Sequence, residues 1–424
     1  MAALIGRMGD EDSYLRALYQ PVALVLLGVL TGMGVTLQTL AARAVGRGEP
    51  ALVQRYFTGI LRACALASVA LLVLVLLIRS PLADWLRVTG DVRSFFDDLL
   101  LAMTLTFPFS LAGEACSAVL RGTGYAGTGT LVSLGQVLVN VAVVAVLGLH
   151  TGLGLYAVAF GAVIAGSVEF GVGVALLRRR GLLVRGRRLG ISVPVLPSLA
   201  RVGLPTASAS LLLSVVTFLL MGIAAPWGPV AVTSLSLGSL VELLALTPAI
   251  GYGSAMSTLM HQCLGADDWP GALRVFRRGL LHVGAGYVAL TLVMVMTGPR
   301  LSVLLSDDPA VVEGIGRYLA IVGPAFGATG VVLSASAVLA PLGRGLLALL
   351  LNALYFTAVL GIGSWAADRY GGVEGLYWTM ALAALASVVT GLPIICWAVV
   401  RAVRPVGPSK ETAIPRPPGI RSHE

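Results

Sequence analysis

Long apolar runs, separated by short polar segments, recur along the whole chain. Each run holds around 20 residues, the length that an α-helix needs to cross the hydrocarbon core of a bilayer. Charged residues, glycine and proline mark the breaks between runs. The pattern predicts an all-α integral membrane fold with 11 transmembrane helices, at 18–44, 57–79, 96–119, 129–149, 154–177, 203–225, 230–263, 280–298, 318–340, 346–366 and 374–400.

The composition excludes a soluble globular domain. Hydrophobic residues make up 57% of the 424 residues and charged residues only 12%, whereas soluble domains carry about 25% charged residues. The four cysteines lie in or beside the apolar runs with no paired spacing, and we expect them to be reduced packing residues.

The distribution of charge predicts the orientation in the membrane. Most of the arginines fall in loops on one side, and arginine-rich loops remain in the cytoplasm. This places the C-terminus in the cytoplasm of a multi-pass protein of the cell inner (plasma) membrane. The net charge of +9 is scattered over alternate loops, which favours contact with anionic lipid of the bilayer over nucleic-acid binding.

Two stretches of the chain repeat each other at a constant offset. GVTLQTLAARAVGRGEPALVQRYFTGIL begins at Gly34, and GSAMSTLMHQCLGADDWPGALRVFRRGL begins at Gly253. The offset of 219 pairs Thr39 with Thr258, Gly46 with Gly265, Arg55 with Arg274, and Phe57 with Phe276. A constant register across a charged loop predicts an internal duplication, hence two pseudo-symmetric helical bundles around a shared route.

The duplication divides the chain into parts. We expect an N-terminal lobe of five helices at 1–180, a cytoplasmic basic linker at 181–202, a C-terminal lobe of six helices at 203–402, and a disordered tail at 403–424. Moving the span 203–225 back by the offset places its counterpart ahead of Met1. The opening segment is therefore expected to be the loop that follows an absent first helix, through either a late start or a lost helix.

Four stretches resemble the multidrug and toxic compound extrusion (MATE) family, within the wider multidrug/oligosaccharidyl-lipid/polysaccharide flippase superfamily. They are GMGVTLQTLAARAVGRGEPALVQRY, FPFSLAGEACSAVLRGTGYAGTGTLVSLGQVLVN, VGLPTASASLLLSVVTF and TPAIGYGSAMSTLMHQCLGADDWPGALRVFRRG. The resemblance implies twelve helices in two lobes and export of cationic or amphipathic compounds in exchange for protons or sodium ions. The chain departs from the family where branches carry coupling carboxylates. The first helix is not there, and the expected seventh and tenth family helices, 203–225 and 318–340, hold no acid.

Three carboxylates fall inside the expected spans. Glu114, Glu169 and Glu242 would each cost about 2.5–3.5 kcal/mol at the bilayer centre, so we expect them to face the protein interior. A carboxylate that faces a cavity can exchange a proton for a cationic substrate, which makes the three candidates for ion coupling. The alternative is a structural partner for a hydroxyl group or an arginine, and the sequence leaves both open.

Neutral polar side chains within the spans are candidates for the substrate pathway. Gln38, Asn140, Gln136 and Asn352 can bond a substrate or an ion. They can equally tie helices together, at about 1 kcal/mol each.

Enzyme chemistry finds no support in the sequence. The single lysine, Lys410, lies in the tail, so there is no phosphate-binding loop with its lysine. The four histidines show no metal-ligand spacing. We therefore expect no cofactor besides the coupling proton or sodium ion, no metal site, and a monomer that acts on a small-molecule substrate.

Three functions remain open. The first is a secondary antiporter with alternating access that exports cationic or amphipathic small molecules. The second is a lipid-linked oligosaccharide flippase, whose pyrophosphate would require basic residues deep in the spans, where the sequence places none. The third is a truncated membrane protein without transport activity.

Overall fold

The computed structural model describes residues 10–85, 91–151, 156–183, 195–370 and 372–403. Within them, 11 helices are long and apolar enough to cross a membrane, which confirms the predicted number. The tail beyond residue 403 and most of the linker at 181–202 lie outside the described residues. The main helices are α2 (Asp10–Gly46), α3 (Pro50–Trp85), α4 (Asp91–Gly122), α5 (Ala126–His150), α6 (Tyr156–Arg179), α8 (Leu204–Ala224), α9 (Pro229–Gly265), α10 (Trp269–Leu305), α11 (Pro309–Val322), α12 (Phe326–Ser336), α13 (Gly345–Tyr370) and α14 (Glu374–Val403).

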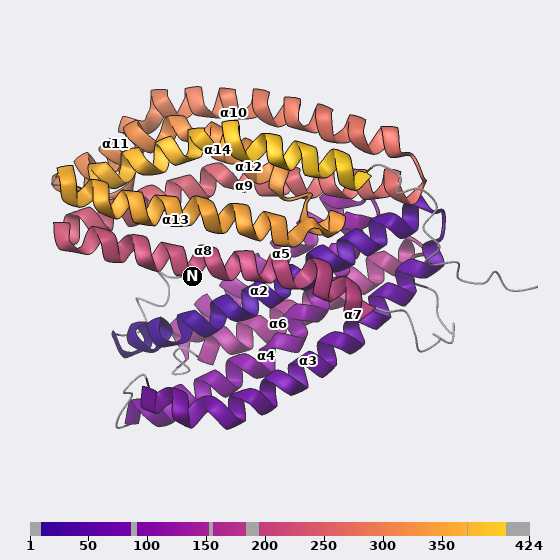
Figure 1. Ribbon diagram of the computed structural model, residues 1–424. Coiled ribbons are helices and arrows are strands. Elements are labelled where there is room, and N and C mark those ends of the chain that lie inside the picture. The colour runs from indigo at the N-terminus through magenta and orange to yellow at the C-terminus, as the bar shows by residue number, and fades with distance from the viewer. Residues whose placement is uncertain (1–9, 86–90, 152–155, 184–194, 371, 404–424) are drawn as a thin grey trace, which may run out of the picture.

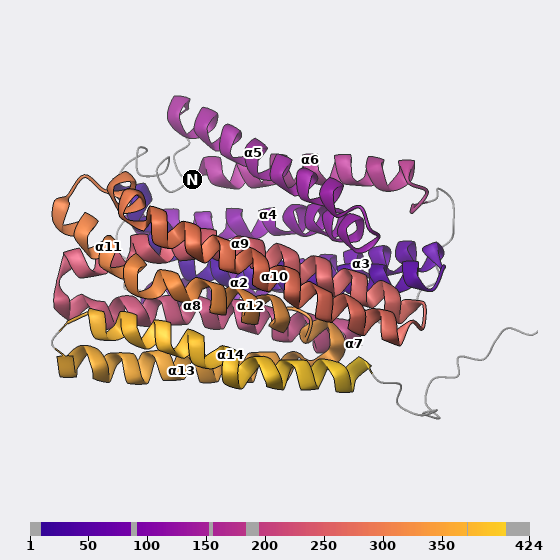
Figure 2. The same cartoon turned by 90° about the horizontal axis from the view of Figure 1, so that it is seen from above.

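The helices form two bundles that lie side by side (Figure 1 and Figure 2). The first bundle holds α2 to α6, in which α4 packs against α2, α3, α5 and α6. The second bundle holds α8 to α14, in which α9 packs against α10, α11 and α12. Backbone polar groups in lipid must be paired within the segment, and continuous helices meet that demand.

The helix starts of the two bundles repeat at a nearly constant offset. The offset is 219 for three pairs of starts: Asp10 with Pro229, Pro50 with Trp269, and Ala126 with Gly345. It is 218 for two more pairs: Asp91 with Pro309, and Tyr156 with Glu374. The turns repeat as well, since left-handed backbone recurs at Gly48 (φ 69°) and Asp267 (φ 58°), and at Gly124 (φ 96°) and Gly343 (φ 79°). The expected pseudo-symmetric bundles are therefore present in the backbone itself.

Four helices begin well before the hydropathy pattern predicts. They start at Asp10, Pro50, Trp269 and Pro309 rather than at 18, 57, 280 and 318. The segments between the observed and the predicted starts contain charged residues, among them Arg55, Arg274 and Glu313, so an apolar window does not include these segments. Part of the opening segment that we expected to be a loop is helix. Aspartate caps stabilise two of the starts, because Asp268 accepts from Gly271 N at 2.8 Å and Asp308 accepts from Ala310 N at 2.9 Å.

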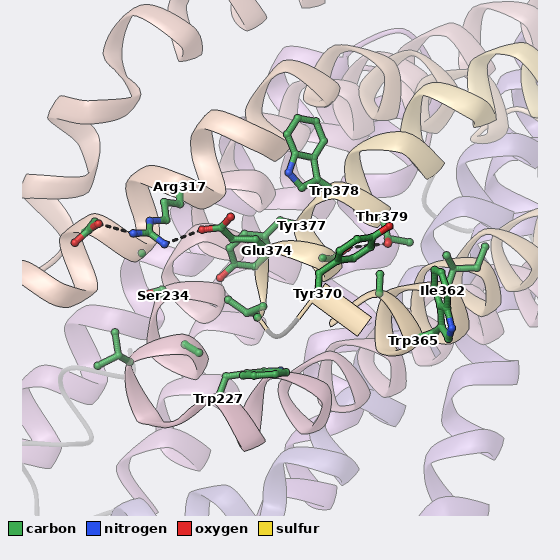
Figure 3. A pocket seen from close by; sticks show the side chains of 18 of the residues that line it. Trp227, Ser234, Arg317, Ile362, Trp365, Tyr370, Glu374, Tyr377, Trp378 and Thr379 are labelled. Atoms are coloured by element: carbon green, nitrogen blue, oxygen red, sulfur yellow. Dashed lines mark hydrogen bonds and ion pairs between the residues drawn. The ribbon is translucent and has the colours of Figure 1, made fainter. Parts of the chain in front are cut away.

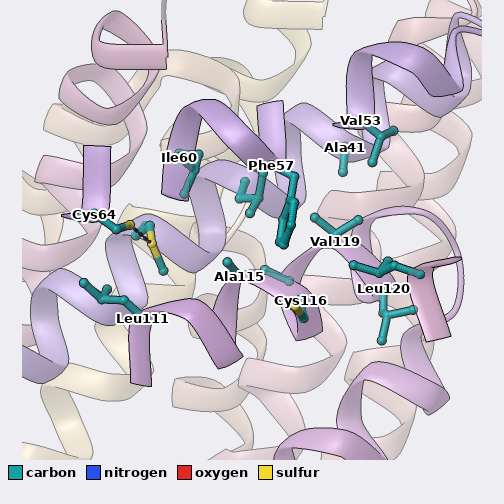
Figure 4. Close-up of a cluster of buried hydrophobic side chains, with 14 of the residues drawn as sticks. Ala41, Val53, Phe57, Ile60, Cys64, Leu111, Ala115, Cys116, Val119 and Leu120 are labelled. Atoms are coloured by element: carbon teal, nitrogen blue, oxygen red, sulfur yellow. Dashed lines mark hydrogen bonds between the residues drawn. The ribbon is translucent and has the colours of Figure 1, made fainter. Parts of the chain in front are cut away.

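Each bundle has its own apolar core. Figure 4 shows the core of the first bundle, where side chains from α2, α3 and α4 meet around Phe57, Ala115 and Cys116. The second bundle packs around the large buried rings of Tyr318, Phe326 and Tyr377. The cysteines in the described chain are free, so packing and not cross-linking holds each bundle.

The bundles meet at the end where the arginine-rich loops lie, which we call the arginine-rich end (residues 43–50, 121–126, 178–183, 201–204, 265–278 and 340–345). A Cβ built on Gly46 would overlap the Gln262 carbonyl oxygen, and one on Gly265 would overlap that of Arg43. Arg43 and Gln262 are themselves 219 residues apart, so this crossing obeys the same pseudo-two-fold symmetry. From here the bundles diverge toward the opposite end (Figure 1).

Candidate functional site

The three interior carboxylates are divided between the bundles. Glu114 on α4 and Glu169 on α6 lie in the first bundle, and Glu242 lies in the middle of α9 in the second. Each accepts a hydrogen bond from a side chain, and the chemical nature of that partner differs among the three.

Glu114 forms an ion pair with Arg121. Both residues belong to α4, separated by two helical turns, and each side chain keeps 21% of its surface exposed. Helix α2 passes closely, because a Cβ on Gly34 would lie 2.5 Å from Glu114 Oε1. The structure therefore gives Glu114 the arginine partner that the sequence offered as the structural alternative.

Glu169 is held by two hydroxyl groups. Ser117 donates to Glu169 Oε1 at 2.7 Å and Ser133 donates to the same atom at 3.3 Å. Only 5% of Glu169 is exposed. The Arg121 guanidinium also donates to Ser133, at 3.3 Å, so the two carboxylates of the first bundle belong to one polar network.

Gln38 extends this network into the second bundle. Its amide nitrogen donates to Ser254 Oγ at 2.8 Å and to Thr258 Oγ1 at 2.7 Å, both on α9. Its amide oxygen accepts from Arg121 Nε at 3.4 Å. A chain of polar contacts thus runs from Glu114 through Arg121 and Gln38 across the junction of the bundles.

Glu242 has a different environment. The Tyr318 hydroxyl on α11 donates to Glu242 Oε2, and no basic residue in the described chain forms an ion pair with it. The close approach of α11 depends on Gly238, where a Cβ would overlap the Tyr318 ring. The ring of Tyr318 in turn meets that of Tyr377 edge to face, with centroids 5.0 Å apart.

A cavity of about 990 Å³ opens in the second bundle at the end away from the arginine-rich end. Aromatic side chains line it, among them Trp227, Trp365, Tyr370, Tyr377 and Trp378 (Figure 3).

An ion-pair cluster of Arg317, Glu313 and Glu374 lines this cavity. Arg317 donates to Glu313 at 2.6 Å and to Glu374 at 2.7 Å. Because two carboxylates face one guanidinium, the cluster carries one excess negative charge. A cavity with aromatic walls and a negative rim suits a cation.

The other neutral candidates stay apart from the carboxylates. Gln136, Asn140 and Asn352 form no side-chain hydrogen bond within the described part of the chain. Asn140 lies against α6, where a Cβ on Gly161 would meet its amide nitrogen at 3.3 Å. Of the four neutral candidates, the structure brings only Gln38 to the carboxylates.

Hydropathy did not reveal the cavity residues. The expected tenth family helix, 318–340, begins after Glu313 and Arg317, whereas α11 contains both. The expected start of this helix at residue 318 is therefore wrong, and the observed helix holds the acid Glu313. The spacing of an acid four residues before an arginine was the available signal, since such pairs stabilise a helix.

Two pseudo-symmetric helical bundles that pair at one end and diverge at the other, with acidic groups buried inside, define the class of polytopic secondary transporters. The MatE family model matches residues 1–146 and 205–363. The chain therefore belongs to the MATE family, whose members are transporters and not enzymes. No curated protein matches the sequence at a significant level.

Solved structures share the fold at low sequence identity. The MATE transporter VcmN from Vibrio cholerae, in its bent form, is 21% identical with a TM-score of 0.82, over 95% of this chain and 90% of that one. An outward-facing multidrug resistance MATE transporter of the MOP superfamily is 16% identical with a TM-score of 0.85, over 94% and 91%. A MOP superfamily transporter from Pyrococcus furiosus is 15% identical with a TM-score of 0.83, over 95% and 91%.

Proposed function

We propose that this protein is a secondary antiporter that exports cationic or amphipathic small molecules in exchange for protons, with Glu242 as the coupling group. Membership of the MATE family supports transport, and the outward-facing relative supports multidrug efflux as the activity. The cavity and the environment of Glu242 support the finer parts of the proposal.

The difference among the three carboxylates carries the choice of Glu242. Arg121 balances the charge of Glu114, and two serines solvate Glu169. Glu242 receives one hydroxyl hydrogen bond and no cation among the described residues. A charge that is buried without a partner is costly. Uptake of a proton by Glu242 therefore removes a penalty that Arg121 and the two serines reduce at the other two carboxylates.

The ligands around Glu242 favour a proton over a sodium ion. Hard metal cations are held by several oxygen ligands, whereas the Tyr318 hydroxyl is the one oxygen among the described residues that is hydrogen-bonded to Glu242. A proton needs only the carboxylate itself. One proton that enters down a potential of about 100 mV provides about 2.3 kcal/mol, enough for a substrate gradient of several tens-fold.

The cavity supports a cationic cargo. Its rim has one excess carboxylate, and its tryptophans offer faces for cation–π contact, each worth about 0.5–2 kcal/mol. A lipid-linked pyrophosphate would instead need unbalanced basic groups. Arg317 is already paired twice, which disfavours the flippase alternative.

The orientation follows from the arginines. Loops rich in arginine remain in the cytoplasm, so we place the arginine-rich end and the C-terminus inside the cell. The bundles then close toward the cytoplasm, and the cavity of the second bundle opens to the exterior of the plasma membrane.

Efflux of ethidium from bacterial cells tests the proposal. The parent protein is expected to lower ethidium accumulation, and Glu242→Gln to abolish this effect while it reaches the membrane in equal amount. Asp307→Asn is the matched control, because it removes an exposed carboxylate of the same bundle that does not line the cavity, and it should retain at least about half of the activity, as most surface substitutions have small effects. Absence of efflux by the parent would instead support a protein without transport activity.

A further inference from the structure

Helix α9 contains a proline in its interior, Pro248. A proline has no backbone N–H group, and its ring collides with the carbonyl group four residues earlier. Such a break is tolerated in a membrane where neighbouring helices supply partners for the backbone groups that it releases. The structure provides these partners at the next residue, Ala249.

The Tyr287 hydroxyl of α10 lies between two backbone groups of α9. It accepts a hydrogen bond from Ala249 N at 2.9 Å and donates one to the Ala245 carbonyl oxygen at 3.0 Å. In a regular α-helix, the N–H group of a residue bonds directly to the carbonyl group four residues earlier. The hydroxyl therefore bonds both members of a pair that a regular helix would join directly.

A second hydroxyl group contacts the same residue from another helix. Ser334 of α12 donates to the Ala249 carbonyl oxygen at 3.1 Å. Ala249 and Ser334 are fully buried, and Tyr287 is 5% exposed. Both backbone groups of Ala249 therefore have a side-chain partner outside α9, in a part of the bundle that is shielded from solvent.

Close packing holds the Tyr287 side chain in this position. A Cβ built on Gly330 of α12 would overlap the Tyr287 ring, and Val283 packs with Tyr287 and Ala249 in one buried cluster. Interior prolines and side chains that insert between helical hydrogen-bond partners are two common causes of sharp helix bends. Helix α9 has both causes at adjacent residues.

This point divides α9 into two parts with different contacts. The outer part, residues 229–244, carries Glu242 and contributes to the wall of the cavity. The inner part, residues 250–265, accepts hydrogen bonds from Gln38 of the first bundle at Ser254 and Thr258. A bend between the two parts therefore moves Glu242 relative to the junction of the bundles.

The first bundle lacks this arrangement at the equivalent positions. With the offset of 219, Pro248 corresponds to Val29 and Tyr287 to Ser68. Valine keeps its backbone N–H group, and the Ser68 hydroxyl has no hydrogen-bond partner in the described part of the chain. The combination of an interior proline and a bridging hydroxyl is therefore specific to the second bundle.

We propose that α9 is hinged at residues 245–249, and that the Tyr287 hydroxyl stabilises the bent form. In the straight form, Ala249 N bonds directly to the Ala245 carbonyl oxygen, and the hydroxyl withdraws from both groups. The hinge lets the outer part of α9 move while Gln38 keeps the inner part at the first bundle. The hinge rests on these contacts and does not require Glu242 to be the coupling group.

Distances between spin labels in lipid nanodiscs test the hinge, on a background in which the four native cysteines are replaced. An outer pair joins Thr233 of α9 to Leu77 of α3, and an inner pair joins Leu259 of α9 to Leu131 of α5; all four side chains are exposed. Thr233 lies 14 residues before Thr247, or about 21 Å, so a bend of about 20° displaces it by up to about 7 Å. Bending should therefore change the outer distance and leave the inner distance unchanged.

Two substitutions should favour the straight form. Pro248→Ala restores a backbone N–H group and removes the collision of the ring, whereas Tyr287→Phe removes the hydroxyl and keeps the ring. Tyr287→Phe should lower the ratio of bent to straight molecules about fivefold, the effect of losing one hydrogen bond, and Pro248→Ala should move the outer distance in the same direction. Tyr252→Phe, at a 40% exposed tyrosine of α9 near the hinge, is the matched control and should give the parent distribution.

The two label pairs decide the inference. An outer distance like that of the parent in both Tyr287→Phe and Pro248→Ala would overturn the hinge. An equal change in the inner distance would also overturn it, because the whole bundle would then move as one body. Neither measurement depends on transport. Ethidium efflux that persists in Glu242→Gln would overturn the coupling assignment and leave the hinge in place.

Discussion

The two bundles have matching backbones and different interiors. Their helix starts repeat at an offset of 218 or 219, but the position equivalent to Glu114 is Leu333, and the position equivalent to Glu242 is Ala23. In the first bundle an arginine, two serines and a glutamine surround the acids. In the second bundle Glu242 accepts from the hydroxyl of Tyr318, and the cavity lies apart from this carboxylate. The two halves therefore share their backbone fold, whereas the polar side chains in their interiors differ.

The division suggests separate tasks. The polar network of the first bundle extends through Gln38 to α9. Its hydrogen bonds to α9 therefore depend on whether the two bundles are in contact at their junction. The Glu242 site extends toward the opposite end and the cavity. Under the proposed function, alternating access needs both a gate at the closed end and a group that exchanges its charge. The polar network at the junction would serve as the gate, and Glu242 would serve as the group that exchanges its charge.

Substitution of Arg121 should lower the free energy of unfolding more than the other changes below. Arg121→Gln leaves the Glu114 carboxylate without its cation and removes a donor to Gln38 and Ser133. Breaking a buried ion pair costs about 3–5 kcal/mol; with a fifth of each side chain exposed, we expect about 2–3 kcal/mol. Chemical denaturation in detergent measures the change, and the double variant with Glu114→Gln should recover part of it. Equal stability of Arg121→Gln and the parent would show that the network does not support the first bundle.

The glycine crossing should respond nearly as strongly. Gly46→Ala and Gly265→Ala each place a methyl group against a carbonyl oxygen of the other bundle. Overpacking costs about 1–3 kcal/mol, and we expect it to favour separation of the bundles at the arginine-rich end. Spin-label distances across that end should lengthen equally in both variants, as the pseudo-two-fold symmetry requires. Gly284→Ala, where a Cβ meets open space, is the control. A shift in only one of the two variants would break the symmetry argument.

Gln38→Ala should have the smallest effect of the three. It removes hydrogen bonds to Ser254 and Thr258, each worth about 0.6–2 kcal/mol between membrane helices, and we expect a net loss near 1 kcal/mol. The same spin-label measurement should detect more open molecules than in the parent. Asn140→Ala, on a side chain without a hydrogen bond to the other bundle, should leave the distribution unchanged. If Gln38→Ala also leaves the distance distribution unchanged, the polar network does not couple the two bundles.

Part of this picture could be predicted from the sequence, and the reasons for success and failure are physical. Apolar runs long enough for a bilayer predict helix number well, and a duplicated loop predicts the symmetry. An arginine partner for an interior carboxylate was the structural alternative that the sequence left open, and Glu114 has this partner in Arg121 of the same helix. The contact between Tyr318 and Glu242 joins residues 76 apart, and no local pattern encodes it.

The cavity was missed because amphipathic turns lower the hydropathy of a helix at its ends. Glu313 and Arg317 were placed in a loop for that reason, although they lie on α11. The crossing of Gly46 and Gly265 was visible only as a sequence repeat. That the repeated residues also touch depends on the symmetry axis, which the packing of helices determines.

The most direct test of the central claim is the number of protons released when a cationic substrate binds. Binding of ethidium to purified protein in weakly buffered solution, with simultaneous pH recording, measures it. Substrate and proton affinities must change each other reciprocally if they are coupled. At a pH below the midpoint of the free protein and above that of the ethidium complex, the parent and Glu114→Gln are expected to release about one proton per ethidium, and Glu242→Gln to release none. Equal release from Glu242→Gln and the parent, or its loss in Glu114→Gln alone, would place the coupling group in the first bundle and contradict the account.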